Sequence, residues 1–179
     1  MKKISKNILF WEIGSALFVI LIGSMFHFIF AWSGYNSIVG AFSAVNESIW
    51  EHTKLAFFPI LIFSLVQYPF VKKKFTNYFA LKLKELMLAV VLIIVIFYTY
   101  SGILGQHYLT LDILDFVVSV ILAKILAYVH LFNRTKGSQI LPIILIIVLG
   151  IFFFYATFCP PKIPLFKDTP TGNFGIIKK

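Results

Sequence analysis

The sequence predicts an all-α fold, a polytopic integral membrane protein built as a bundle of five transmembrane helices. Its 179 residues are 60% hydrophobic and only 13% charged, whereas a soluble domain is about half apolar and about a quarter charged. Five apolar segments are long enough, or nearly so, to cross a hydrocarbon core of about 30 Å. These segments lack the alternation of barrel strands, which favours helices.

The five expected crossings follow one another along the chain. The first follows a basic N-terminus and is interpreted as an uncleaved signal anchor, because its apolar run is too long for a cleaved signal peptide. In chain order the segments are Ile8–Phe30, Thr53–Val71, Glu85–Leu104, Leu109–Phe132 and Ile140–Phe158. Residues 1–158 are therefore predicted to form a five-helix transmembrane domain.

The distribution of lysine and arginine predicts the orientation of this domain. The connections Ala31–His52 and Gln106–Tyr108 contain neither residue, whereas the opposite connections are basic. By the positive-inside rule the N-terminus is cytoplasmic and, after five crossings, the C-terminus is extracytoplasmic. The net charge of +9 thus indicates membrane topology and no binding of nucleic acid. The basic residues on the predicted cytoplasmic side are Lys2, Lys3, Lys6, Lys72, Lys73, Lys74, Lys82, Lys84, Arg134 and Lys136.

Residues 159–179 are expected to form an extracytoplasmic tail that packs on the bundle. A turn signal at residues 168–172 and several prolines separate apolar residues such as Leu165, Phe166 and Phe174. A solvated tail would be polar, so the apolar residues indicate packing against protein or the membrane surface. Four lysines in this tail oppose the predicted orientation, but early segments carry more weight in the positive-inside rule.

The stretch AVNESIWEHTKL, residues 44–55, gathers two of the seven acidic residues and one of the four histidines. Asn46 is expected to cap a helix that continues into the second crossing, with Glu47 at its first position. Glu47 and Glu51 then lie one turn apart on one face, where like charges repel. Lys54, a bound cation or a proton is needed to offset this repulsion.

Two further segments carry polar residues on one helical face. Such faces usually point into a bundle, so the first and fourth crossings are expected to face each other. This arrangement places His27 near Asp112 and Asp115, and Glu12 near His130 or Lys124.

Most acidic residues and three histidines therefore gather at the predicted extracytoplasmic end. Mixed histidine and carboxylate groups bind divalent metals such as Zn²⁺ and also serve acid–base catalysis. The candidate catalytic residues are Glu47, Glu51, His52 and Asp112. The candidate metal ligands are His27, His52, His107, Asp112 and Asp115. No contiguous motif such as HExxH is present, so a polar network that fixes helix register is the structural alternative.

Three stretches, HFIFAWSG, AVNESIWEHTKL and PPKIPLFKDTPTGNFG, together resemble a family of small bacterial membrane proteins common among Firmicutes. The core of the resemblance is Asn46-Glu47 followed by Trp50-Glu51-His52. A proline is common in the family where this chain has Ala44, and this difference affects only the entry to the helix. The resemblance implies a multi-pass protein of a bacterial cell membrane and implies no activity.

Three classes of function stay open from the sequence. The first is a metal-dependent or acid–base site that acts on a lipid or another extracytoplasmic substrate. The second is a structural or assembly partner in a membrane complex, which would bind another protein. The third is a small transporter, which needs a polar path through the middle of the bundle. The sequence offers only Ser15 and Ser119 there, which argues against transport.

Overall fold

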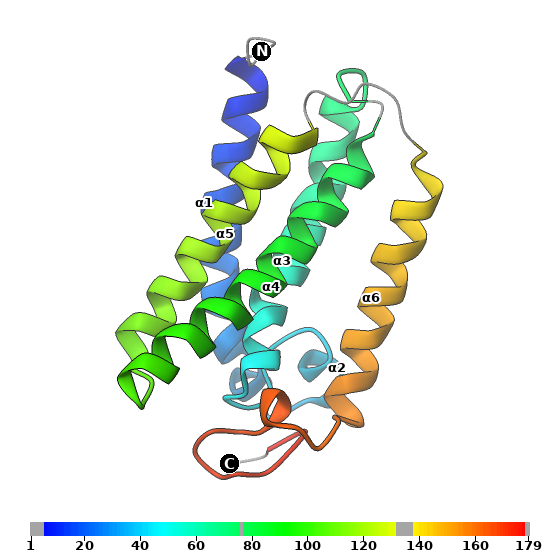
Figure 1. Cartoon of the computed structure of the whole chain (residues 1–179). Coiled ribbons are helices and arrows are strands. Elements are labelled where there is room, and N and C mark those ends of the chain that lie inside the picture. The colour runs from blue at the N-terminus through cyan, green and yellow to red at the C-terminus, as the bar shows by residue number, and fades with distance from the viewer. Residues whose placement is uncertain (1–5, 76, 132–137, 178–179) are drawn as a thin grey trace.

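The computed structural model describes residues 6–75, 77–131 and 138–177, and within these ranges the chain is helical, with no strand. Five long helices run alternately up and down the molecule (Figure 1). They are α1 (Lys6–Trp32), α3 (Ile49–Val71), α4 (Tyr78–Leu104), α5 (Leu109–Leu131) and α6 (Ile140–Phe158). The short helix α2 (Ser37–Gly40) and the 3-10 turn η1 (Pro164–Phe166) complete the elements. The all-α prediction is confirmed for the described residues.

Four helices in the described ranges are long and apolar enough to cross a membrane: α1 from Asn7, α3, α4 and α6. Helix α5 has 23 residues but carries Asp112, Asp115 and Lys124, and it is not among the four. Length and composition therefore support a membrane protein, whereas the count of five crossings stays a prediction.

Helices α3 and α4 begin earlier than the apolar runs predict. Helix α3 begins at Ile49, before its apolar run at Thr53 but after Glu47, the expected first helical residue, and α4 begins at Tyr78 instead of Glu85. The prediction that Lys82 lies in a basic connection is therefore wrong. Lys82 and Glu85 are both 1% exposed and form an ion pair inside the bundle. Because paired charges can be buried, the helix continues through residues that an apolar-run criterion excludes.

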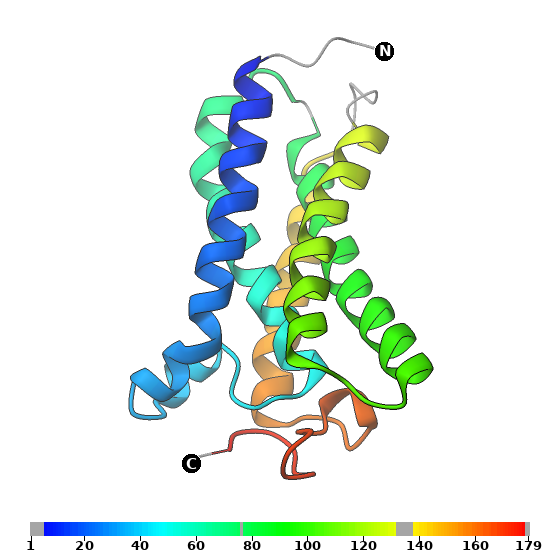
Figure 2. The same ribbon diagram turned by 90° about the vertical axis from the view of Figure 1, so that its left-hand side faces the viewer.

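The main apolar core is centred on α3 and α4, includes buried residues of α1, α5 and α6, and is joined by the tail at one end. The ring of Trp50 on α3 stacks on Phe153 of α6, with centroids 4.6 Å apart. Phe166 of η1 lies against the same tryptophan at 4.8 Å. Leu165 and Phe174 also pack against this core. Figure 2 shows the tail crossing the end of the bundle where α3 begins, opposite the N-terminus.

Helix α1 lies very close to α3 and α5 at Gly23. A Cβ atom at this position would lie 2.4 Å from the backbone oxygen of Leu55 on α3. It would also lie 2.6 Å from the ring of Phe116 on α5. Only glycine permits this approach. The contact sets the height at which His27, one turn further along α1, meets the start of α3.

Candidate functional site

The loop that enters α3 builds the candidate site. Ser48 is the N-cap of α3, and its hydroxyl accepts the backbone N–H of Glu51. The prediction that Asn46 caps the helix is wrong: its side-chain oxygen accepts the N–H of Ser48 at 2.8 Å, forming a turn before the helix. Glu47 therefore lies outside α3. The predicted repulsion between Glu47 and Glu51 on one helical face does not arise.

Glu47 meets two histidines that come from different helices. Its Oε2 atom lies 3.3 Å from Nε2 of His27 on α1 and 3.3 Å from Nε2 of His52 on α3. The two imidazole rings are stacked, with centroids 5.4 Å apart. One ligand atom from each of the three residues lies within 4.8 Å of the other two. We call His27, Glu47 and His52 the His–Glu–His cluster.

The two histidines also set the charge state of Glu47. Hydrogen bonding by His27, and then by His52, holds the pKa of the Glu47 carboxyl well below its ordinary value, against the opposing effect of burial. The carboxylate is therefore ionised at neutral pH. Because the folded-state pKa is lowered, the stabilisation is present above the ordinary carboxyl pKa of about 4.3. It is lost only as the pH falls through the lowered value.

The C-terminal tail holds the backbone of Glu47. The Glu47 N–H donates to Oδ1 of Asp168 at 2.7 Å, and the hydroxyl of Thr169 donates to the Glu47 carbonyl at 3.3 Å. The Asn46 amide adds a bond to the carbonyl of Gly175 at 2.8 Å. Asp168 is itself buried and accepts the Thr171 N–H at 3.0 Å with its other oxygen. The tail therefore positions the one carboxylate of the cluster.

Glu51, a candidate catalytic residue, points away from this cluster. Its Oε2 lies 2.5 Å from Nζ of Lys54 and accepts the N–H of Val45 at 3.0 Å. Lys54 in turn donates to the carbonyl of Gly40 and the hydroxyl of Thr157, both at 2.9 Å. Glu51 is 2% exposed and Lys54 is fully buried. This pair ties the loop, α3 and α6 together.

The remaining candidate residues lie around the start of α5. Nδ1 of His107 is 3.1 Å from Oδ2 of Asp112, and the hydroxyl of Tyr100 donates to the same carboxylate. Asp115 is buried and accepts the hydroxyl of Ser119 at 2.9 Å. His27 thus meets Glu47, and not Asp112 or Asp115 as expected, because the loop before α3 folds against α1. His107, Asp112 and Asp115 are not brought into the His–Glu–His cluster.

A second polar group lies nearer the end where α1 begins, and sequence reasoning predicted only its Glu12–Lys124 contact. Glu85 pairs with Lys124 at 2.5 Å and with Lys82 at 2.9 Å. Glu12 lies 3.4 Å from Lys82 and 3.8 Å from Lys124. The expected approach of Glu12 to Lys124 is therefore present, while the side chain of His130 lies outside the described residues. We call Glu12, Lys82, Glu85 and Lys124 the buried quartet.

A sequence signal for the quartet did exist. Lys82 and Glu85 are three residues apart and so share one face of a helix. Sequence reasoning assigned the first to a connection and the second to the edge of a crossing, which concealed the pair.

The chain belongs to a family of unknown function (DUF6512), whose model matches residues 1–176. No curated protein and no solved structure matches it. The match agrees with the expected membership of a family without an assigned activity, whereas bacterial origin stays a prediction. Family membership supplies no chemistry, so function is argued from the geometry of the site.

Proposed function

We propose that this family member is a multi-pass protein of a bacterial cell membrane that binds a divalent metal such as Zn²⁺ at His27, Glu47 and His52. The separation of the ligand atoms carries the proposal. Two atoms that each lie about 2.0–2.1 Å from zinc at a tetrahedral angle are about 3.4 Å apart. Both Nε2–Oε2 distances in the cluster are 3.3 Å. Both histidine–glutamate pairs therefore have the spacing that a tetrahedral zinc ion requires, and all three ligand atoms lie within 4.8 Å of one another.

The kind of ligands and their exposure favour a reactive metal over a purely structural one. Two histidines and one glutamate leave the fourth position of a tetrahedral ion open, as in catalytic zinc sites. The three side chains are 21–37% exposed, so water and substrate can reach them. A metal bound here supplies a Lewis acid and a bound water of lowered pKa. The chain itself supplies two imidazoles fixed by α1 and α3, and an ionised carboxylate fixed by the tail.

A neighbouring pocket supports a substrate on the same side. It has a volume of about 430 Å³ and lies between the end of α4 and the tail. Asp168 and Thr169, which bind the Glu47 backbone, line it together with His107 and Lys167. The basic side chains suit a phosphate or carboxylate group. We therefore propose a lipid or another extracytoplasmic substrate, with α5 as a fifth crossing, the N-terminus cytoplasmic and the tail outside.

Metal analysis of the purified chain tests this proposal. Protein isolated without chelator should carry about one zinc ion per chain. Replacing His52→Gln removes one of three ligands and should lower zinc content at least about tenfold. His107→Gln is the matched control, because His107 is also an exposed histidine beside a carboxylate but lies outside the cluster. It should leave zinc content unchanged.

Equal metal content in the wild type and the His52→Gln variant, including none in either, would refute the metal site. If the variant then also lost thermal stability, His52 would be part of a structural network. If zinc were lost only in the His107→Gln variant, the metal site would be at the start of α5 and not at the His–Glu–His cluster.

A further inference from the structure

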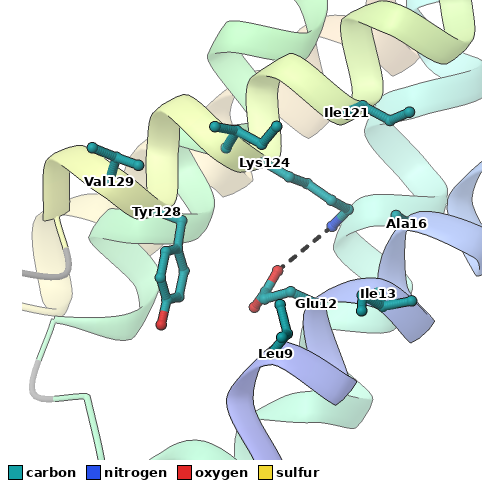
Figure 3. A pocket seen from close by; sticks show the side chains of 9 residues that line it. Leu9, Glu12, Ile13, Ala16, Ile121, Lys124, Tyr128 and Val129 are labelled. Carbon is teal, nitrogen blue, oxygen red and sulfur yellow. Dashed lines mark ion pairs between the residues drawn. The ribbon is translucent and has the colours of Figure 1, made fainter. Parts of the chain in front are cut away.

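A second pocket, of about 300 Å³, lies between α1 and α5 (Figure 3). Its mouth is aliphatic, and its side chains are 40–62% exposed in the described chain. The residues of the mouth are Leu9, Ile13, Ile121, Ile125 and Val129. Glu12 and Lys124 also line the pocket and point toward each other across it in Figure 3. The pocket therefore combines an apolar entrance with a charged floor.

The charge on the floor is balanced. The buried quartet contains two carboxylates and two ammonium groups. Lys124 is already held at short distance, by Glu85 at 2.5 Å and by the hydroxyl of Ser15 at 2.7 Å. A ligand with a net charge would leave one charge uncompensated at a depth where that is costly. Charge balance thus favours a neutral ligand.

Glu12 is the carboxylate of the quartet that lines the pocket, and its contacts with the two lysines are long. Its Oε1 accepts the Gln67 amide at 3.0 Å. Its Oε2 lies 3.5 Å from Lys82 and 3.8 Å from Lys124, whereas charge-assisted hydrogen bonds are normally about 2.7–2.9 Å long. A carboxylate accepts up to about four hydrogen bonds. Oε2 is therefore placed to accept one more, and the ligand group that meets it should be a donor.

The depth of Glu12 in the membrane further restricts the class of ligand. Glu12 lies six residues after the start of α1 at Lys6, about 9 Å along the helix axis. A phosphate headgroup stays at the membrane surface, but a small neutral hydroxyl can enter the hydrocarbon region at lower cost. We propose that the α1–α5 pocket binds a neutral long-chain lipid with a free hydroxyl, which donates to Glu12 while the hydrocarbon chain lies between the two helices. This inference is independent of the metal site.

Photolabelling of the full-length protein in phosphatidylcholine nanodiscs tests the proposal. The probes are a diazirine-bearing sixteen-carbon alcohol and its methyl ether, which has the same chain but no donor. The alcohol should reach half-saturation at a concentration at least about tenfold lower than the ether, because a hydrogen bond to a charged group discriminates by that factor. Labelled peptides should come from α1 and α5.

Two matched variants locate the binding. Ile125→Trp fills the pocket, and Ile113→Trp places the same side chain on the same helix outside it. The native residues are similarly exposed, 52% and 56%. Labelling by the alcohol should be lost only in the first variant. Equal half-saturation for alcohol and ether, or equal labelling of the two variants, would overturn the proposal. Crosslinking at position 125 in native membranes gives a further check. If it captured a helix of another protein instead of lipid, the proposal would also be overturned.

Discussion

Glu47 and Glu51 are four residues apart and chemically identical, yet they have opposite environments. Glu47 precedes the helix and faces two imidazoles at a half-exposed site. Glu51 lies in the first turn of α3 and is sealed against Lys54. The difference follows from the position of the N-cap residue Ser48, because Glu47 lies before the cap and Glu51 lies after it. Of the two, only Glu47 is accessible to a metal or substrate.

Substitutions of the Glu51–Lys54 pair should therefore affect stability and not metal binding. Lys54→Met leaves a buried carboxylate without its cation and should cost about 3–5 kcal/mol of stability. The double variant Glu51→Gln, Lys54→Met removes both charges and should recover part of that loss. Thermal unfolding in detergent gives the comparison, and zinc content should stay at the wild-type level in Glu51→Gln. Zinc loss in this variant with an unchanged melting temperature would instead make Glu51 part of the site.

At the scale of helices, the sequence predicts the elements better than their contacts. A chain in lipid must satisfy its backbone internally, so each long apolar run reliably predicts a helix. Contacts between polar faces are not determined in this way. The loop before α3 supplies Glu47 to His27, and no helical periodicity describes a loop. Similarly, Lys82 and Glu85 neutralise each other inside the bundle. Because the sequence prediction treated their charges as exposed, it put the start of α4 too late in the chain.

The packing of α1 can be tested with two glycines of that helix. Gly23→Ala places a methyl group against the Leu55 backbone, which cannot yield easily, and should cost about 1–3 kcal/mol. It should also lower zinc content, because it displaces His27. Gly14→Ala meets only the end of the Phe63 ring, at 3.9 Å, and should stabilise α1 by up to about 1 kcal/mol. Equal melting temperatures for the two variants would contradict the close contact at Gly23.

On the scale of the whole molecule, α1 joins two polar sites at different depths. It contributes Glu12 to the buried quartet and His27 to the His–Glu–His cluster, and these residues lie about 22 Å apart along the helix. The two sites should therefore belong to different leaflets of the bilayer. Because Lys82 is buried inside the bundle, it does not mark the cytoplasmic surface, but Lys72, Lys73 and Lys74 are exposed in the same connection.

Cysteine labelling in intact cells tests this orientation. The native Cys159 is exposed and is first replaced by serine. Gln106→Cys should then react with a membrane-impermeant maleimide, because its loop is predicted to lie outside. Lys73→Cys should react only after the cells are lysed. The reverse pattern would place the His–Glu–His cluster in the cytoplasm.

The hydrogen bond between Glu47 and Asp168 joins residues 121 positions apart in the chain. A ribosome that adds about 5–20 residues per second makes the second residue roughly 6–24 s after the first. For almost all of that interval, from the synthesis of His52 onwards, Glu47 and both histidines exist, but the carboxylate that holds the Glu47 backbone does not. Maturation of the cluster is therefore timed by synthesis of the tail, and a protein stalled before this segment has the ligands without their fixed geometry.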